Sequence, residues 1–81
     1  MEKAYFVIIR SEFKEEKIPD ENTMKFWACE GDISSDEKTY TKATIVFYAS
    51  SQELKEKFKI GERYKMVLEK GEGIYFFVKG L

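Results

Sequence analysis

Aromatic side chains interleaved with lysines are the residues of this sequence best suited to do chemistry. Five of them stand at alternate positions of two strand-like runs: Trp27, Tyr40, Tyr48, Lys25 and Lys42. If these positions face solvent, the rings can stack on nucleobases, because every base presents a π-face, and each stack contributes about 1–3 kcal/mol. Lysines beside the rings would attract phosphates in a salt-dependent manner. The pattern predicts a platform for single-stranded nucleic acid.

The same side chains have a second interpretation, in which they pack rather than bind. The aromatics could lie against the long loop of residues 14–22, against a partner subunit, or inside a barrel, since a one-residue slip in pairing exchanges the two faces of a strand. Arg10 either joins the groove or is a solvated strand residue with a packed stem. Several carboxylates in residues 14–22 would repel phosphate and favour a basic protein partner: Glu15, Glu16, Asp20 and Glu21.

Catalytic chemistry has little support in the sequence. There is no histidine to act as a general base near pH 7, and no glycine-rich loop follows a strand and opens a helix to cradle a phosphate. Cys29, the only cysteine, lacks the histidine that commonly activates a thiol nucleophile. The carboxylates Asp32, Asp36 and Glu37 do not follow the spacing of a calcium loop. We therefore expect a protein that is not an enzyme and has no cofactor or metal site.

Length and composition limit the chain to one small domain, residues 1–81. A single cysteine excludes an internal disulfide, so stability must come from packing, for which 43% hydrophobic and 16% aromatic residues are a good supply. The net charge of −1 opposes strong, non-specific duplex binding, which usually needs a basic domain. No apolar stretch is long enough to span a membrane and the first residues carry no secretory pattern, so we expect a cytoplasmic protein without membrane contact.

Five strand-like runs and one helix-like run must position the candidate residues. The strand-like runs cover residues 4–13, 23–30, 39–49, 62–70 and 74–79. Between the third and fourth of them, Ser50 and Glu53 have the spacing of a capping box. Leu54 and Phe58 then share one face, and Gly61 suits a helix C-terminus. We expect this short helix to plug one end of a barrel.

Alternation along the middle strands assigns their faces. In residues 23–30 it sets one group of side chains against another: Met24, Phe26 and Ala28 against Lys25, Trp27 and Cys29. In residues 39–49 it predicts a core-facing group and an outer group: Ala43, Ile45, Phe47 and Ala49 against Tyr40, Lys42, Thr44, Val46 and Tyr48. These assignments place Trp27 on the solvent side of the sheet.

The order of the runs resembles the OB-fold, a five-stranded Greek-key barrel with one short helix between its third and fourth strands. The segment 58–68, with the pair Gly61-Glu62 opening an alternating strand, is similar to many small-barrel sequences after the helix, SH3-like barrels included. The resemblance implies a ligand on the face of the second and third strands, between the loops at residues 14–22 and 70–73. Its predicted site residues are Trp27, Tyr40, Tyr48, Lys25, Lys42 and Arg10.

Two functions from different classes follow from these observations. The first is single-stranded DNA or RNA binding, as in the compact single-strand binders of phages, archaea and bacteria that this chain resembles. The second is a protein–protein interaction module that uses the same aromatic face, since Trp and Tyr are favoured interface anchors. We expect a monomer or a homodimer. Spare apolar side chains on the strand faces would be covered either by the second copy or by the protein's own loops: Tyr5, Val7, Ile9, Tyr75 and Phe77.

Overall fold

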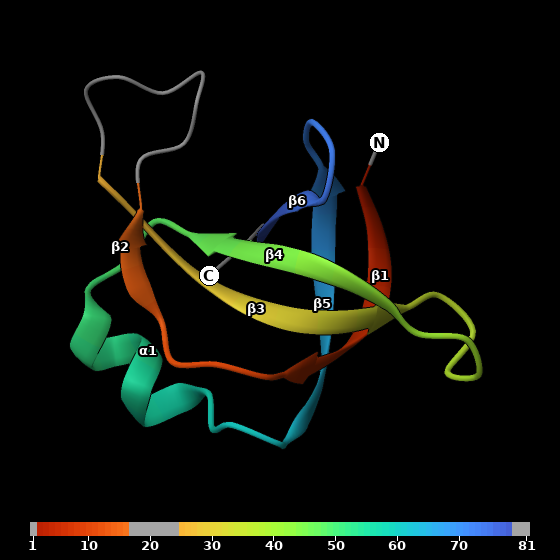
Figure 1. Ribbon diagram of the computed structural model, residues 1–81, viewed down its shortest axis with the longest axis horizontal. Coiled ribbons are helices and arrows are strands. Elements are labelled where there is room, and N and C mark those ends of the chain that lie inside the picture. The colour runs from red at the N-terminus through yellow and green to blue at the C-terminus, as the bar shows by residue number, and fades with distance from the viewer. Residues whose placement is uncertain (1, 17–24, 79–81) are drawn as a thin grey trace.

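The computed structural model describes residues 2–16 and 25–78, which form strands and one helix (Figure 1). The strands are β1 (Glu2–Ile9), β2 (Lys14–Glu16), β3 (Phe26–Ser34), β4 (Thr41–Phe47), β5 (Arg63–Lys70) and β6 (Tyr75–Val78), and the helix is α1 (Ser51–Lys57). In Figure 1, β3 and β4 run across the view, and β1 and β5 run nearly at right angles to them. The predicted mainly β architecture with one short helix is confirmed.

Five of the strands close into a barrel because β1 pairs on both of its edges. β1 is antiparallel to β5 through residues 2–8 and to β3 through residues 6–9. The circuit continues from β5 to β6, from β6 to β4 and from β4 to β3, and only the β4–β6 pairing is parallel. This closed five-stranded barrel is compatible with the OB-like plan that the order of the runs predicted.

A short strand that the sequence did not predict adds to the edge of β3. Residues 14–16, expected to belong to a loop, pair as β2 with residues 26–28. All three β2 side chains are exposed, so no hydrophobic alternation marks the strand in the sequence. Because of β2, the helix lies between β4 and β5 rather than between the third and fourth strands in chain order. The first part of the expected second strand, residues 23 and 24, lies outside the described residues.

The inside of the barrel holds one main core, which consists of Val7, Ile9, Phe13, Cys29, Ile33, Ala43, Ile45, Phe47, Leu54, Met66, Leu68 and Phe76. Each of the five barrel strands contributes residues from one face, as expected when one face of a pleated strand is buried. Val7 and Ile9 therefore point into the barrel, and Tyr5 packs against the same core. The expectation that these β1 side chains form a spare outer face for a homodimer is wrong.

The helix closes the end of the barrel where β4 finishes (Figure 1). Its capping box forms as predicted, with the Ser50 hydroxyl accepting from the Glu53 backbone N–H and the Glu53 carboxylate accepting from the Ser50 N–H. Leu54 is buried in the main core, and the Phe58 ring lies 5.0 Å from that of Phe47. The helix ends at Lys57, before Gly61, which adopts a positive φ of 87° in the turn that leads into β5.

Gly31 marks the place where β1 crosses β3. A Cβ added at this position would lie 2.9 Å from the Ile8 carbonyl oxygen and 3.3 Å from Ile45 Cγ1. Real Cβ atoms essentially never make a contact as short as the one with the Ile8 carbonyl oxygen, and that oxygen belongs to the backbone. The two strands can therefore pair closely here because residue 31 has no side chain. No local sequence pattern predicts this role of Gly31.

Candidate functional site

The outer surface of β3, β4 and β6 carries side chains in three rows that cross the sheet. The strand registers define the rows as Ala28–Val46–Phe77, Glu30–Thr44–Tyr75 and Asp32–Lys42. We call this surface, together with Phe26 and Tyr48 at its end nearest the helix, the outer face. Its helix end is apolar and aromatic, and its other end is charged.

Three rings meet at the apolar end of the outer face. The Phe26 ring centroid lies 6.0 Å from that of Tyr48 and 6.3 Å from that of Phe77, both in edge-to-face geometry. Val46 is fully buried beneath them, and Tyr48 is 69% exposed. We call Phe26, Tyr48 and Phe77 the outer aromatic cluster. An aromatic ring that is largely exposed and supported by other rings is suited to stack on a ligand.

Trp27 does not belong to this cluster, which corrects the predicted face of the second strand. The side chain is partly buried and packs against the main core, on the same side of β3 as Cys29 and Ile33. Both faces of β3 are apolar near its start, since Phe26 and Ala28 are also buried. Period-two alternation cannot tell which of two apolar faces is inside, so Phe26 takes the outer position that was predicted for Trp27.

The remaining predicted residues on β3 and β4 are spread along the strands. Tyr40 and Lys42 stand at the start of β4, whereas Tyr48 follows its end. At roughly 3.3 Å per residue, the separation of eight positions places Tyr40 and Tyr48 roughly 26 Å apart along the strand. Lys25 precedes β3 and its ammonium lies 3.8 Å from the Glu15 carboxylate. The structure therefore brings none of these residues into the predicted three-ring platform.

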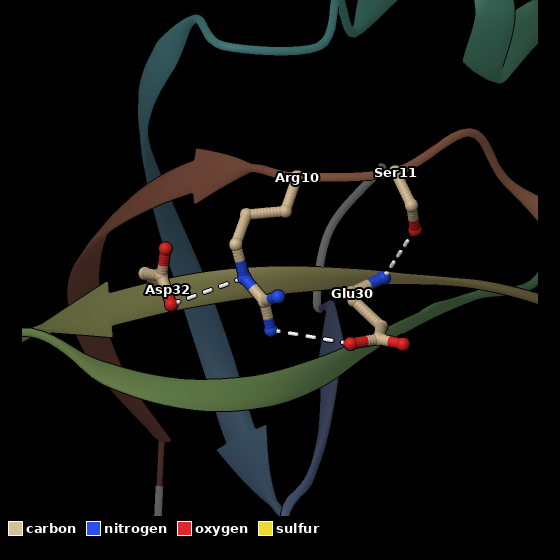
Figure 2. Close-up of polar contacts among 4 residues, drawn as sticks. All are labelled: Arg10, Ser11, Glu30 and Asp32. Carbon is tan, nitrogen blue, oxygen red and sulfur yellow. Dashed lines mark hydrogen bonds and ion pairs between the residues drawn. The ribbon is translucent and has the colours of Figure 1, made fainter.

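Arg10 lies at the charged end of the outer face, between β1 and β2 (Figure 2). Its Nη2 donates to Glu30 Oε1 at 3.3 Å, and its Nε lies 3.1 Å from Asp32 Oδ1 without hydrogen-bond geometry. Ser11 completes the junction, because its hydroxyl accepts from the Glu30 backbone N–H at 2.9 Å. Two carboxylates thus compensate the guanidinium, which ties the turn after β1 to the middle of β3.

A cleft of about 280 Å³ opens between this junction and the neighbouring strands. Carboxylates outnumber cations along it, and its lining includes Glu12, Glu16, Glu30, Lys14, Thr44 and Tyr75. Pairing of Lys14 with Ala28 places that lysine beside the outer aromatic cluster. The charged residues that line the cleft therefore carry a net negative formal charge, to which Glu16 contributes from the predicted acidic loop.

Sequence reasoning missed Phe26 and Phe77 as members of one cluster. Phe77 was recognised as an outward side chain of the last strand, but the parallel pairing of β6 with β4 that puts it beside Val46 joins residues far apart in the sequence. Gly71 supports the ring from the turn before β6, since a Cβ there would lie 2.5 Å from Phe77 Cε1. Local alternation could assign a face to each residue, but not the neighbours on that face.

The Cys29 thiol is poorly suited to react as a nucleophile in this fold. Its side chain is part of the main core, and burial raises the pKa of its thiol from 9.0 to about 12. The thiolate, which is the nucleophilic form, is therefore scarce at neutral pH. Among residues 2–16 and 25–78, no three acidic or thiol side chains come together in a way that could hold a metal ion. Nor does any helix in this part of the chain have the length and apolar character needed to cross a membrane.

Comparisons with protein-family models, with curated proteins and with solved structures gave no match for this chain. Its class is defined by its fold and by its surface: a closed five-stranded β-barrel with a short helix at one end and an aromatic cluster on the outside of three adjacent strands.

Proposed function

We propose that this protein is an OB-like barrel that binds single-stranded DNA or RNA on the outer face. The observation that carries the proposal is the exposed Tyr48 ring, supported by Phe26 and Phe77 on β3, β4 and β6. In OB-folds the second and third barrel strands form the ligand face, and here those strands are β3 and β4. The aromatic cluster therefore lies where this fold commonly holds a strand of nucleic acid.

Each part of the outer face has a separate role in the proposal. Tyr48 stacks on a base, and Phe26 and Phe77 hold the ring in place. Phe77, which is partly exposed, offers its edge to the next base. Lys14 and Lys42, one toward each end of the face, contact phosphates. Arg10 positions the turn after β1 instead of binding phosphate, because Glu30 and Asp32 already compensate its charge.

The small number of cations on the outer face predicts a weak dependence on salt. If two lysines neutralise two phosphates, log K should fall with log salt at a slope of about −1.4, from the value of about −0.7 per phosphate for single strands. Most of the binding free energy would then come from stacking. A slope this shallow agrees with the carboxylates of the neighbouring cleft, which oppose a strongly basic groove.

The test is the fluorescence anisotropy of a labelled oligo-dT, titrated with protein at several salt concentrations, with an RNA oligomer in parallel. Tyr48→Ala should weaken binding by about 5–150-fold, which is about 1–3 kcal/mol of lost stacking, whereas Tyr48→Phe should retain affinity within about 2-fold. Ile60→Ala is the matched control, since Ile60 is also an exposed apolar residue (56%) but stands between α1 and β5. Equal affinities for the wild type and Tyr48→Ala, or no binding of either oligomer, would exclude the proposal.

A protein partner is the second candidate function, and the acidic cleft beside the cluster favours it. A basic segment of a partner would meet Glu12, Glu16 and Glu30, and Tyr48 would serve as the buried anchor of the interface. A second copy of this chain is one such partner. In that case Tyr48→Ala would abolish partner binding or self-association while the oligonucleotides showed no binding at any salt concentration.

We also propose that the chain is not an enzyme and acts in the cytoplasm. The buried Cys29 thiol, with its pKa raised to about 12, is unsuited to nucleophilic catalysis at neutral pH. A single unpaired thiol is compatible with a reducing compartment. Incubation with oligonucleotides should leave them intact, which gel electrophoresis after the anisotropy titrations would check.

A further inference from the structure

A second concave site lies at the end of the barrel opposite the helix. It has a volume of about 380 Å³ and is formed by the start of β1, the end of β3, the loop that follows β3 and the end of β5. Its floor consists of inward-facing apolar groups of the barrel: Tyr5, Ile33 and Phe76. Its size lies within the range of small-ligand pockets, which are commonly apolar inside with a few polar groups at the edge.

Two lysine ammonium groups flank the aromatic part of this floor. Lys3 Nζ lies 6.0 Å from the centroid of Tyr5, and Lys70 Nζ lies 5.9 Å from that of Phe76. The two rings are themselves edge-to-face at 5.4 Å, so the cations and the rings form one continuous group. Within the described part of the chain, no carboxylate oxygen lies within 4.0 Å of either ammonium group.

Hydroxyl groups and one carboxylate line the opposite side of the pocket. Thr39 and Thr41 contribute hydroxyls there, and Asp36 stands between β3 and β4. Asp36 Oδ1 accepts from the backbone N–H groups of Lys38 and Thr39 at 2.9 and 3.1 Å and from the Ser34 hydroxyl at 2.9 Å. These bonds lower the pKa of the Asp36 carboxyl. Oδ2 makes none of them and can accept from a ligand.

We propose that this pocket binds a nucleoside phosphate. The base or sugar lies against the Tyr5–Phe76 floor, the phosphate meets Lys70, and a hydroxyl or amino group of the ligand donates to Asp36. Lys3 does not line the pocket, but its ammonium group beside the Tyr5 ring adds positive charge next to it. The arrangement suits a ligand that is anionic at one side, flat and apolar in the middle, and a hydrogen-bond donor at the other side. Inorganic phosphate alone lacks the last two features, and an uncharged nucleoside lacks the first.

The source of the nucleoside phosphate is either a free mononucleotide or the phosphorylated end of a strand. The ligand class can be tested by two-dimensional ¹H–¹⁵N NMR. The full chain is titrated with AMP, with adenosine and with inorganic phosphate in three separate experiments. AMP should shift the amides of residues 33–41 and 70, adenosine should bind at least 5-fold more weakly, and phosphate alone should produce no saturable shift. A 5′-phosphorylated oligomer that shifts the same amides more than its unphosphorylated form would identify the strand end as the source.

Lys70→Gln should lower the AMP affinity at least 5-fold. Lys65→Gln is the matched control. Lys65 is on the same strand as Lys70, and its ammonium group also lies near an aromatic ring, 5.5 Å from the centroid of Phe6. Lys65 does not line the pocket. Equal loss in both variants, or AMP shifts confined to other amides, would overturn the inference. Both lysines are exposed, so both variants should fold.

This inference and the proposed function can fail independently. Tyr48 stands at the helix end of the outer face, so Tyr48→Ala should leave AMP binding unchanged. If oligonucleotides do not bind but AMP does, the proposed function is wrong and the assignment of the pocket to a nucleoside phosphate remains supported. If oligonucleotides bind through Tyr48 but AMP causes no shift, the pocket assignment is wrong and the proposed function stands.

Discussion

Among the glycines that the structure describes, Gly31 is the one at which replacement by alanine should destabilise the barrel most. The new Cβ would stand 2.9 Å from the Ile8 carbonyl oxygen, and ordinary contact begins at 3.4 Å, so the β1 backbone would have to move by about 0.5 Å. Ile8 is held on both sides, by pairing with Asp32 on β3 and with Arg63 on β5. The strain therefore cannot be relieved by rotating a side chain.

The magnitude follows from three terms. Overpacking of a fixed core position costs about 1–3 kcal/mol. Moving β1 also weakens the hydrogen bonds that Arg10 and Ser11 donate to the Glu30 carbonyl at 2.8 and 3.2 Å, each contributing about 1 kcal/mol. The lower entropy of the unfolded alanine chain offsets about 0.4–1 kcal/mol. A loss of about 2–3 kcal/mol is expected, against a total of about 4–12 kcal/mol for a chain of this length.

Urea denaturation followed by Trp27 fluorescence measures this loss, since Trp27 packs against the main core and reports its unfolding. The melting temperature should fall by roughly 10–20 °C. Gly73→Ala is the control, because a Cβ there meets nothing within 4 Å and the cost comes only from its φ of 59°, about 1–2 kcal/mol. A Gly31→Ala free energy of unfolding within about 0.5 kcal/mol of the wild type would refute the crossing argument.

Three further predictions concern the helix, the outer aromatic cluster and the thiol. Leu54→Ala truncates the only buried side chain of α1 and should lower the free energy of unfolding by about 2–5 kcal/mol, measured by thermal denaturation. Lys57→Ala, at an exposed position of the same helix, is the control and should remain as stable as the wild type. Gly71→Ala should displace the Phe77 ring, change its aromatic NMR signals and weaken oligonucleotide binding. The free energy of unfolding should fall by less than about 1 kcal/mol, because only the Phe77 side chain must move. Unchanged Phe77 signals would contradict this prediction. Cys29 should not react with a thiol reagent at pH 8 until the protein unfolds. Since its pKa is about 12 folded and 9.0 unfolded, its contribution to stability is complete below pH 9 and is lost as the pH rises toward 12, a loss that Cys29→Ala should not show.

The sequence by itself determined the elements that depend on neighbours along the chain. The helix start was predictable because the hydroxyl of Ser50 and the carboxylate of Glu53 meet within one turn. The inner side of β4 was predictable because Ala43, Ile45 and Phe47 share one face, and the polar residues Lys42 and Thr44 stand on the other. The order of the strand-like runs and of the helix also predicted a small barrel, through its resemblance to the OB-fold.

Only the tertiary structure decided which residues meet across the strands. Both faces of β3 are apolar near its start. The pairing of β3 with β4, and of β4 with β6, places Trp27 inside and Phe26 outside. The edge strand β2 carries no hydrophobic pattern, since its residues gain backbone hydrogen bonds without burying side chains. The outer aromatic cluster and the pocket at the far end of the barrel each join residues that are distant in the chain. Their positions depend on register, which arises from the packing of the whole barrel and not from any local segment.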